Sequence, residues 1–132
     1  MDIEHLDHLV ITVRDIKTTC DFYRRLLGMD IIEFAGNRKA LVFGRQKINL
    51  HQYGSEFKPH ARYPTPGSAD LCFLTSMPID EIVKHCRENN VDILEGPVRR
   101  TGATGALLSV YLRDPDGNLV EIASPLPDAN AK

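Results

Sequence analysis

The chain carries the same order of elements twice, and this repeat restricts the folds open to it. Each half begins with a strand-like run, at 6–13 and at 68–75, and ends with another, at 47–52 and at 117–123. Between these runs each half holds a helix-like segment followed by further strand-like segments. A repeated unit usually buries one face against its copy. We therefore predict two related modules that pack around a common interior.

Both modules have the pattern β-α-β-β-β. In the first, apolar residues at helical spacing run from Asp15, a suitable N-cap, to Gly28, a suitable stop. In the second, a helix should begin near Ser76 and end at Asn89-Asn90. The expected strands are 6–13, 29–34, 39–43 and 47–53 in the first module, and 70–75, 92–97, 107–113 and 118–124 in the second.

Residues 54–68 separate the modules, because they contain two Gly and three Pro without periodicity. The segment 114–118 (DPDGN) predicts a hairpin turn between the last two strands. We expect one α+β domain at 1–124, with module 3–53, linker 54–68, module 69–124 and a flexible tail at 125–132. Helices on one side of each sheet would leave the other faces to curl around a shared cavity.

The overall composition excludes several kinds of partner. The 16 basic and 18 acidic residues form no basic stripe, so we expect no nucleic-acid binding. The apolar runs are far shorter than the ~20 residues of a membrane span, and residues 1–5 do not resemble a signal peptide. Cys20, Cys72 and Cys86 lack CxxC spacing, which favours reduced, buried thiols in a cytoplasmic protein.

Four side chains that can bind metal occupy equivalent places in the repeat: His8, His51, Asp70 and Glu121. Each alone has an ordinary explanation, such as a hydrogen-bonded strand histidine or a carboxylate on a solvent face. The repeat, however, predicts that all four meet. Two imidazoles and two carboxylates without a thiolate suit one divalent ion, which could be Ni, Zn, Mn, Co or Fe.

Further residues could contact a substrate. Strand alternation places Asn49 on the same face as His51, and Tyr111 on the same face as Arg113. Arg100 precedes the glycine-containing loop 101–105 and could clamp an anionic substrate. The alternatives are a plain mobile loop and ordinary strand packing.

Three segments carry a family resemblance that extends over residues 3–124. The segments 6–10 (LDHLV), 22–29 (FYRRLLGM) and 113–121 (RDPDGNLVE), within the repeated module, resemble the vicinal oxygen chelate superfamily. That superfamily includes glyoxalase I, fosfomycin-resistance enzymes, extradiol dioxygenases and bleomycin-binding proteins. The chain also resembles small glyoxalase-domain proteins, some labelled as biphenyl-diol dioxygenase relatives or virulence proteins. The resemblance implies a glyoxalase-like fold and a homodimer.

The resemblance also assigns roles to the candidate ligands. His8 and Glu121 stand where the family has metal ligands, whereas His51 replaces a Glu of glyoxalase I and Asp70 replaces a His of most members. The leading hypothesis is a metal-dependent lyase or isomerase acting on a small dicarbonyl adduct, with Glu121 or Asp70 as the base. The alternatives are an Fe(II) extradiol dioxygenase and a non-catalytic protein that sequesters a ligand.

Overall fold

The computed structural model describes residues 1–127, which form an α+β protein with two four-stranded sheets and two helices. The contacts within the chain define two compact units, and each is described separately. Unit 1 comprises Met1–Ala69 together with Pro115–Gly117. Unit 2 comprises Asp70–Asp114 and the residues from 118 to the end of the described chain. The expected α+β fold and the two modules are confirmed.

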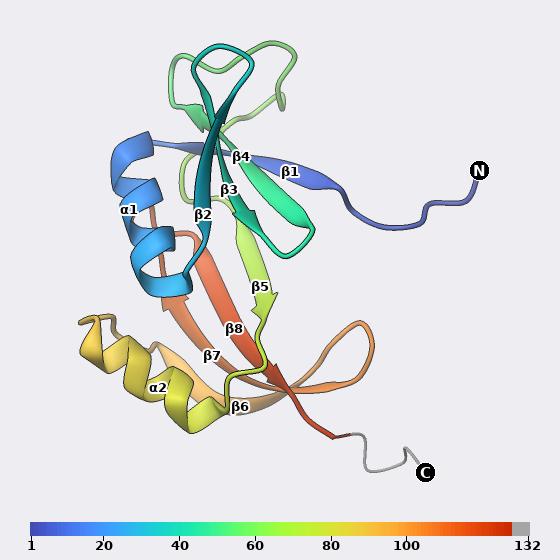
Figure 1. Ribbon diagram of the computed structural model, residues 1–132, viewed down its shortest axis with the longest axis vertical. Helices are drawn as coiled ribbons and strands as arrows, with labels where there is room; N and C mark the ends of the chain where they lie inside the picture. Colours follow the sequence, from blue (N-terminus) through green and yellow to red (C-terminus); the bar gives the residue numbers. More distant parts are fainter. Residues whose placement is uncertain (128–132) are drawn as a thin grey trace. The chain divides into compact units, whose positions relative to one another are not determined.

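Unit 1 follows the predicted β-α-β-β-β order. Its elements are β1 (His8–Val13), α1 (Ile16–Leu27), β2 (Asp30–Phe34), β3 (Arg38–Phe43) and β4 (Gln46–Gln52). The sheet order is β1-β4-β3-β2, in which β1 runs parallel to β4 and the other pairs are antiparallel (Figure 1). Every predicted boundary in this unit lies within two residues of the observed one.

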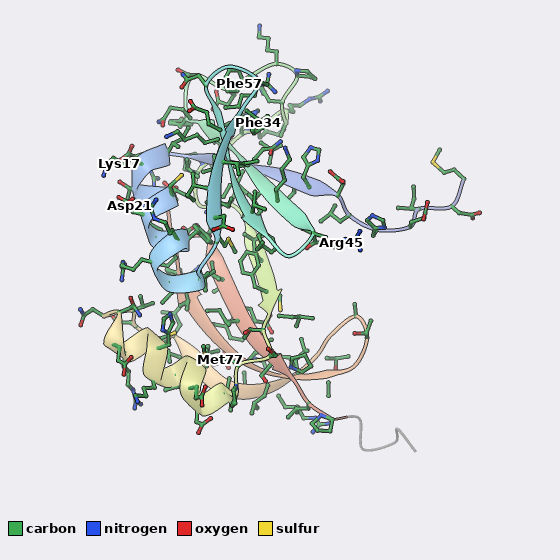
Figure 2. The ribbon with its side chains drawn as sticks, in the orientation of Figure 1. Lys17, Asp21, Phe34, Arg45, Phe57 and Met77 are labelled. Atoms are coloured by element: carbon green, nitrogen blue, oxygen red, sulfur yellow. The ribbon has the colours of Figure 1, made fainter. Side chains whose placement is uncertain are left out.

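Helix α1 covers one face of the unit 1 sheet. It follows Asp15 at the N-cap position and ends at Gly28, whose φ of 65° is the left-handed conformation that glycine adopts without strain. Tyr23 and Leu26 are buried against the sheet, and so are the central β3 and β4 residues on that face. Lys17 and Asp21 form an i,i+4 ion pair on the helix (Figure 2). The candidate residues His8, Asn49 and His51 alternate with the buried residues of their strands, so they lie on the opposite face of the sheet.

Unit 2 repeats the architecture with one shifted strand. Its elements are β5 (Asp70–Leu74), α2 (Ile79–Glu88), β6 (Glu95–Thr101), β7 (Ala106–Arg113) and β8 (Leu119–Pro125), in the sheet order β5-β8-β7-β6 (Figure 1). The prediction of a strand at 92–97 is wrong at both ends. The strand passes through Pro97 because β6 is an edge strand with an irregular register between Glu95 and Val98.

Helix α2 covers one face of the unit 2 sheet. It begins at Ile79, three residues after the predicted start near Ser76, and ends at Glu88, with the predicted stop residue Asn89 as its C-cap. Ile82 and Cys86 are buried. The strand residues Val110, Leu112, Val120 and Ile122 are buried as well. The alternate residues of the same strands therefore lie on the face without a helix, and these include Tyr111 and Glu121.

The predicted turn at 114–118 is confirmed, and its polar side chains close it. The buried Asn118 donates its backbone N–H to Asp114 Oδ1 at 3.0 Å and its side-chain amide to Asp114 Oδ2 at 2.8 Å. Within unit 1, the backbone N–H of Arg14 donates to Asp116 Oδ1 at 3.1 Å. Gly67 lies so close to this turn that a Cβ there would come within 2.5 Å of the Asp116 carbonyl oxygen.

Three smaller expectations have mixed outcomes. Cys20 and Cys86 are buried free thiols, as predicted, but Cys72 is exposed because it lies on the face of β5 without a helix. No helix within residues 1–127 has the length and apolar character to cross a membrane. The predicted flexible tail at 125–132 begins with Pro125, the last residue of β8, and the N–H of the next residue, Leu126, donates to Ala106 O; residues 128–132 lie outside the described chain.

Candidate functional site

Unit 2 contains a pocket of about 630 Å³ on the face of its sheet that carries no helix. Strands β5, β6, β7 and β8 each contribute to its wall, and the loop between β6 and β7 supplies the remainder. The lining residues most capable of chemistry are Cys72, Arg100, Tyr111 and Glu121. Pockets of this size accommodate small organic molecules.

The half-buried Glu121 lies at the centre of this group. It pairs in register with Cys72 on the parallel neighbour β5 and with Tyr111 on the antiparallel neighbour β7. Packing around the sulfur, followed by the charge and hydrogen bonding of Glu121, raises the pKa of the Cys72 thiol to about 11. Burial also raises the pKa of Tyr111, and the Glu121 charge contributes to this shift. Both groups therefore stay protonated at neutral pH, whereas Glu121 offers a carboxylate.

Arg100 adds a positive charge to the pocket. Its Nε donates to the Tyr111 hydroxyl oxygen at 2.9 Å, and its Nη2 donates to Glu95 Oε1 at 3.4 Å. The hydrogen bond from Arg100 lowers the pKa of Tyr111, but burial outweighs it. Arg100 belongs to strand β6, so the sheet fixes its position. Two predicted substrate-binding residues, Arg100 and Tyr111, thus line one pocket.

Two other candidates of unit 2 lie at its periphery. Arg113 is exposed at the end of β7 and is not among the pocket-lining residues of the described chain. Asp70 is exposed at the start of β5, on the same face as Cys72, and its charge makes the smallest contribution to the raised thiol pKa. Because Cys72 pairs with Glu121, both carboxylates that we predicted as catalytic share this face of the sheet.

In unit 1, His8 is held by its sequence neighbour. Its Nδ1 hydrogen-bonds with Asp7 Oδ2 at 2.8 Å, and this contact lowers the pKa of Asp7. A carboxylate on one ring nitrogen fixes the orientation of the imidazole and leaves the other nitrogen available to a metal or a substrate. The His8 side chain is 43% exposed at the start of β1.

The register of β1 and β4 argues against a shared ion for His8 and His51. His8 pairs with Lys47, whereas His51 pairs with Thr12, four residues further along. Four residues advance a strand by about 13 Å, whereas two nitrogens on one ion lie about 4 Å apart or less. The His51 ring instead contacts Phe57 edge to face, with centroids 5.6 Å apart. Burial, followed by the charge of Arg38, lowers the pKa of His51.

Asn49 is better placed than His51 for a site with His8. Its register partner on β1 is Val10, so it lies only two residues from the position of His8 on the same face. Its side-chain oxygen Oδ1 is buried and has no hydrogen-bond partner among the described residues. A buried carbonyl oxygen of this kind normally has a donor or a cation as its partner. We predicted Asn49 as a substrate contact and not as a metal ligand. Its position two residues before His51, on the same face of the strand, is the sequence feature that could have suggested a ligand.

Within the described residues no three His, Cys, Asp or Glu side chains gather into a cluster able to hold a metal ion. His8 belongs to unit 1, and Asp70 and Glu121 belong to unit 2. The convergence of these three side chains on one ion therefore stays a prediction.

The sequence matches a known family over most of its length. The Glyoxalase/Bleomycin resistance protein/Dioxygenase superfamily matches residues 5–122, and the chain belongs to this superfamily. It is 58% identical to the Virulence protein STM3117 of Salmonella typhimurium over 93% of this chain and 85% of that protein. It is 54% identical to the glyoxalase domain-containing protein RDO1 of Mycosarcoma maydis, over 94% of this chain and 70% of that protein.

Solved structures support the same assignment. The crystal structure of STM3117 superimposes with a TM-score of 0.94 and 57% identity, over 96% of this chain and 100% of that one. The fosfomycin resistance protein FosX of Listeria monocytogenes, solved with Mn(II) and sulfate, shares the fold with a TM-score of 0.66 at 19% identity, over 95% of this chain and 93% of that one. A metallothiol transferase FosB of Staphylococcus saprophyticus is 26% identical over 91% of this chain and 76% of that protein.

Proposed function

We propose that this chain is a divalent-metal-dependent lyase or isomerase that acts on a small dicarbonyl adduct, with Glu121 as the group that moves the proton. One observation carries the proposal: Glu121 is a carboxylate in the wall of a 630 Å³ pocket, flanked by a protonated thiol and a protonated phenol. Among these three neighbours only the carboxylate is ready to accept a proton at neutral pH.

The residues around Glu121 support this role. Tyr111 interacts with the carboxylate and is itself held by Arg100, so the two side chains orient the base. The guanidinium of Arg100 supplies positive charge beside a carbonyl oxygen that becomes negative as its neighbouring carbon loses a proton. Glu121 would take that proton and return it to the adjacent carbon, so that the substrate is isomerised without net loss of atoms.

The donor set fits a divalent ion. His8, Asp70 and Glu121 offer one imidazole and two carboxylates, and Asn49 adds an amide oxygen that is buried without a partner. Nitrogen and oxygen donors of this kind suit Mn, Fe, Co, Ni or Zn. A bound ion of this class polarises carbonyl oxygens and stabilises the negative charge that develops on them. Asp7 would hold His8 in the orientation that this site requires.

The dioxygenase alternative is less well supported. It would use two imidazoles and one carboxylate around iron, and the register separates the two imidazoles of unit 1 that we expected to supply them. The other alternative is a protein that binds a ligand without turning it over. An assay that measures both binding and turnover distinguishes it from an enzyme. The proposal also includes a homodimer, which light scattering tests directly.

The test combines activity and substitution in the full chain. The protein is loaded in turn with Mn, Fe, Co, Ni and Zn and assayed with the hemithioacetal of methylglyoxal and glutathione, and with catechol under oxygen. We expect turnover of the hemithioacetal and a loss of about 100-fold in kcat for Glu121→Gln. Glu33→Gln, an exposed strand carboxylate of unit 1, should keep full activity. Catechol cleavage, or tight binding of the adduct without turnover with every metal, would overturn the proposal.

A further inference from the structure

The pocket of unit 2 has a thiol in its wall. Cys72 lines this pocket and is exposed, whereas the other two cysteines of the chain, Cys20 and Cys86, are buried. A cysteine thiol is a strong nucleophile, and its addition to an aldehyde gives a hemithioacetal. The substrate class proposed above includes adducts of this kind. The chain therefore carries, inside the pocket, the type of group from which such an adduct is made.

Glu121 is placed to act as the base for this thiol. Cys72 and Glu121 are register partners on the neighbouring parallel strands β5 and β8 (Figure 1). Both the charge and the hydrogen bonding of Glu121 act on the Cys72 sulfur. A thiol beside a base does not have to ionise in advance, because the base accepts its proton while the bond from sulfur to carbon forms. The two residues thus form a nucleophile and base pair.

Other lining residues suit a small dicarbonyl compound with an apolar substituent. Arg100 donates from Nε to the Tyr111 hydroxyl oxygen at 2.9 Å, which holds the guanidinium in the pocket wall. A guanidinium in this position stabilises a carbonyl oxygen that becomes negative. Leu74 and Leu107 line the same pocket and supply apolar surface for the substituent.

A buried hydroxyl group independently indicates a polar ligand on this face of the sheet. Ser109 lies on β7 midway between Leu107 and Tyr111, which both line the pocket, so strand alternation places all three side chains on the same face. The Ser109 Oγ atom is buried and has no hydrogen-bond partner among the described residues. A buried hydroxyl normally has a partner, so this one calls for a polar atom from outside the chain.

We propose that Cys72 itself supplies the thiol, so that the chain converts a free 2-oxoaldehyde with an apolar substituent into the 2-hydroxy acid without an external thiol. This inference rests on the proposed function, because the same carboxylate of Glu121 moves the proton. It adds a covalent intermediate on Cys72, and water is the second reactant.

The reaction has three steps. First, the Cys72 sulfur adds to the aldehyde carbon: the C–S bond forms, the C=O π bond breaks, and the thiol proton passes through Glu121 to the aldehyde oxygen. Second, Glu121 moves the C–H proton of that carbon to the neighbouring ketone carbon, and the hydroxyl proton moves to the ketone oxygen. The first carbon is thereby oxidised to a thioester and the second is reduced to an alcohol. Third, water attacks the thioester, the C–S bond breaks, and a proton returns to the sulfur.

The test compares a free dicarbonyl with a preformed adduct in the full chain. The metal-loaded protein receives methylglyoxal or phenylglyoxal in thiol-free buffer and, separately, the hemithioacetal of methylglyoxal and glutathione. Chromatography measures the 2-hydroxy acid formed in thiol-free buffer, and the rate with the glutathione adduct is measured in parallel. The variant is Cys72→Ser. The matched control is Cys20→Ala, which removes a buried thiol from α1 of unit 1.

We expect the unmodified chain to form the 2-hydroxy acid in thiol-free buffer, at a rate that falls by about 100-fold or more in Cys72→Ser and by less than about twofold in Cys20→Ala. Added glutathione should restore turnover of methylglyoxal by Cys72→Ser, because the external thiol forms the adduct that the variant no longer makes. This rescue separates loss of the nucleophile from loss of the fold.

The outcomes separate the two proposals. Turnover of the glutathione adduct without any turnover in thiol-free buffer would overturn this inference and leave the proposed function intact, and this result needs no variant. Equal thiol-free rates in Cys72→Ser and the unmodified chain would also overturn it. Turnover of neither substrate would overturn both proposals.

Discussion

Cys72 and Glu121 are register partners on the parallel strands β5 and β8, and the carboxylate of one helps to keep the thiol of the other protonated. This arrangement makes Glu121 the reactive group of the pair, because a thiol with a pKa of about 11 provides little thiolate at neutral pH. The exposed position of Cys72 makes the relationship measurable, since the thiol reports directly on the charge beside it.

Removal of the Glu121 charge should activate Cys72. In Glu121→Gln the thiol pKa falls towards its ordinary value of 9.0, and the rate of alkylation by iodoacetamide at pH 8 should rise by about tenfold. Asp70→Asn should give a smaller rise, because Asp70 contributes least to the shift. Mass spectrometry of the peptides separates Cys72 from the buried Cys20 and Cys86. An unchanged rate in Glu121→Gln would place the carboxylate away from the thiol.

The lowered pKa of His51 predicts how stability depends on pH. Between the folded pKa and the unfolded value of 6.5, the unfolded chain binds a proton that the folded chain does not. The free energy of unfolding should therefore be fully retained above pH 6.5 and should fall as the pH drops from 6.5 towards the lowered pKa of the folded state. In His51→Gln this dependence should be shallower, as measured by urea unfolding in EDTA. His5→Gln, at an exposed position that does not contribute to the His51 shift, should keep the native slope; equal slopes for all three proteins would contradict the assignment.

Much of the fold follows from sequence patterns. Apolar spacing and the Gly28 stop locate α1 to within a residue because propensity, capping and burial agree there. Strand β6 is misplaced because Pro97 indicates a strand end, and a sequence does not reveal that the strand is an edge with an irregular register that tolerates the missing N–H. The exposure of Cys72 was missed for a related reason: a short apolar strand does not show which of its faces the helix covers.

Sequence reasoning named Arg100, Tyr111 and Glu121, which line the pocket, but it did not give the geometry of the site. Strand alternation correctly placed Asn49 and His51 on one face, yet alternation says nothing of position along the strand. The pairing of His8 with Lys47 decides how far apart His8 and His51 lie along the strands, and only the folded chain fixes this register. The network from Arg100 through Tyr111 to Glu121 likewise depends on registers between three strands.

Asn49 and His51 should respond differently to metal. In a titration with Mn or Zn, Asn49→Ala should lose several-fold in affinity, because it removes a buried oxygen close to His8. His51→Ala should change the affinity less than twofold, since its ring packs on Phe57. The reverse order would restore His51 as a ligand and would require a register other than the one observed.

Gly67 should be sensitive to substitution for a steric reason. Its φ is 78°, and a Cβ would lie 2.5 Å from the Asp116 carbonyl oxygen, so Gly67→Ala should lower the free energy of unfolding by about 2–3 kcal/mol. Gly36 has a similar φ of 64° with open space around its Cβ position, so Gly36→Ala should cost only about 1 kcal/mol. Urea unfolding of both variants isolates the clash, and equal losses would show that the turn is not packed there.

The most direct test of the central claim is the affinity of the full chain for divalent metal, measured by calorimetry with Mn, Co, Ni and Zn. The account predicts one ion per chain, and a loss of at least about tenfold in affinity for both His8→Ala and Glu121→Ala with little change in circular dichroism. Glu33→Ala should bind metal as the unmodified chain does. Unchanged stoichiometry and affinity in both His8→Ala and Glu121→Ala would contradict it.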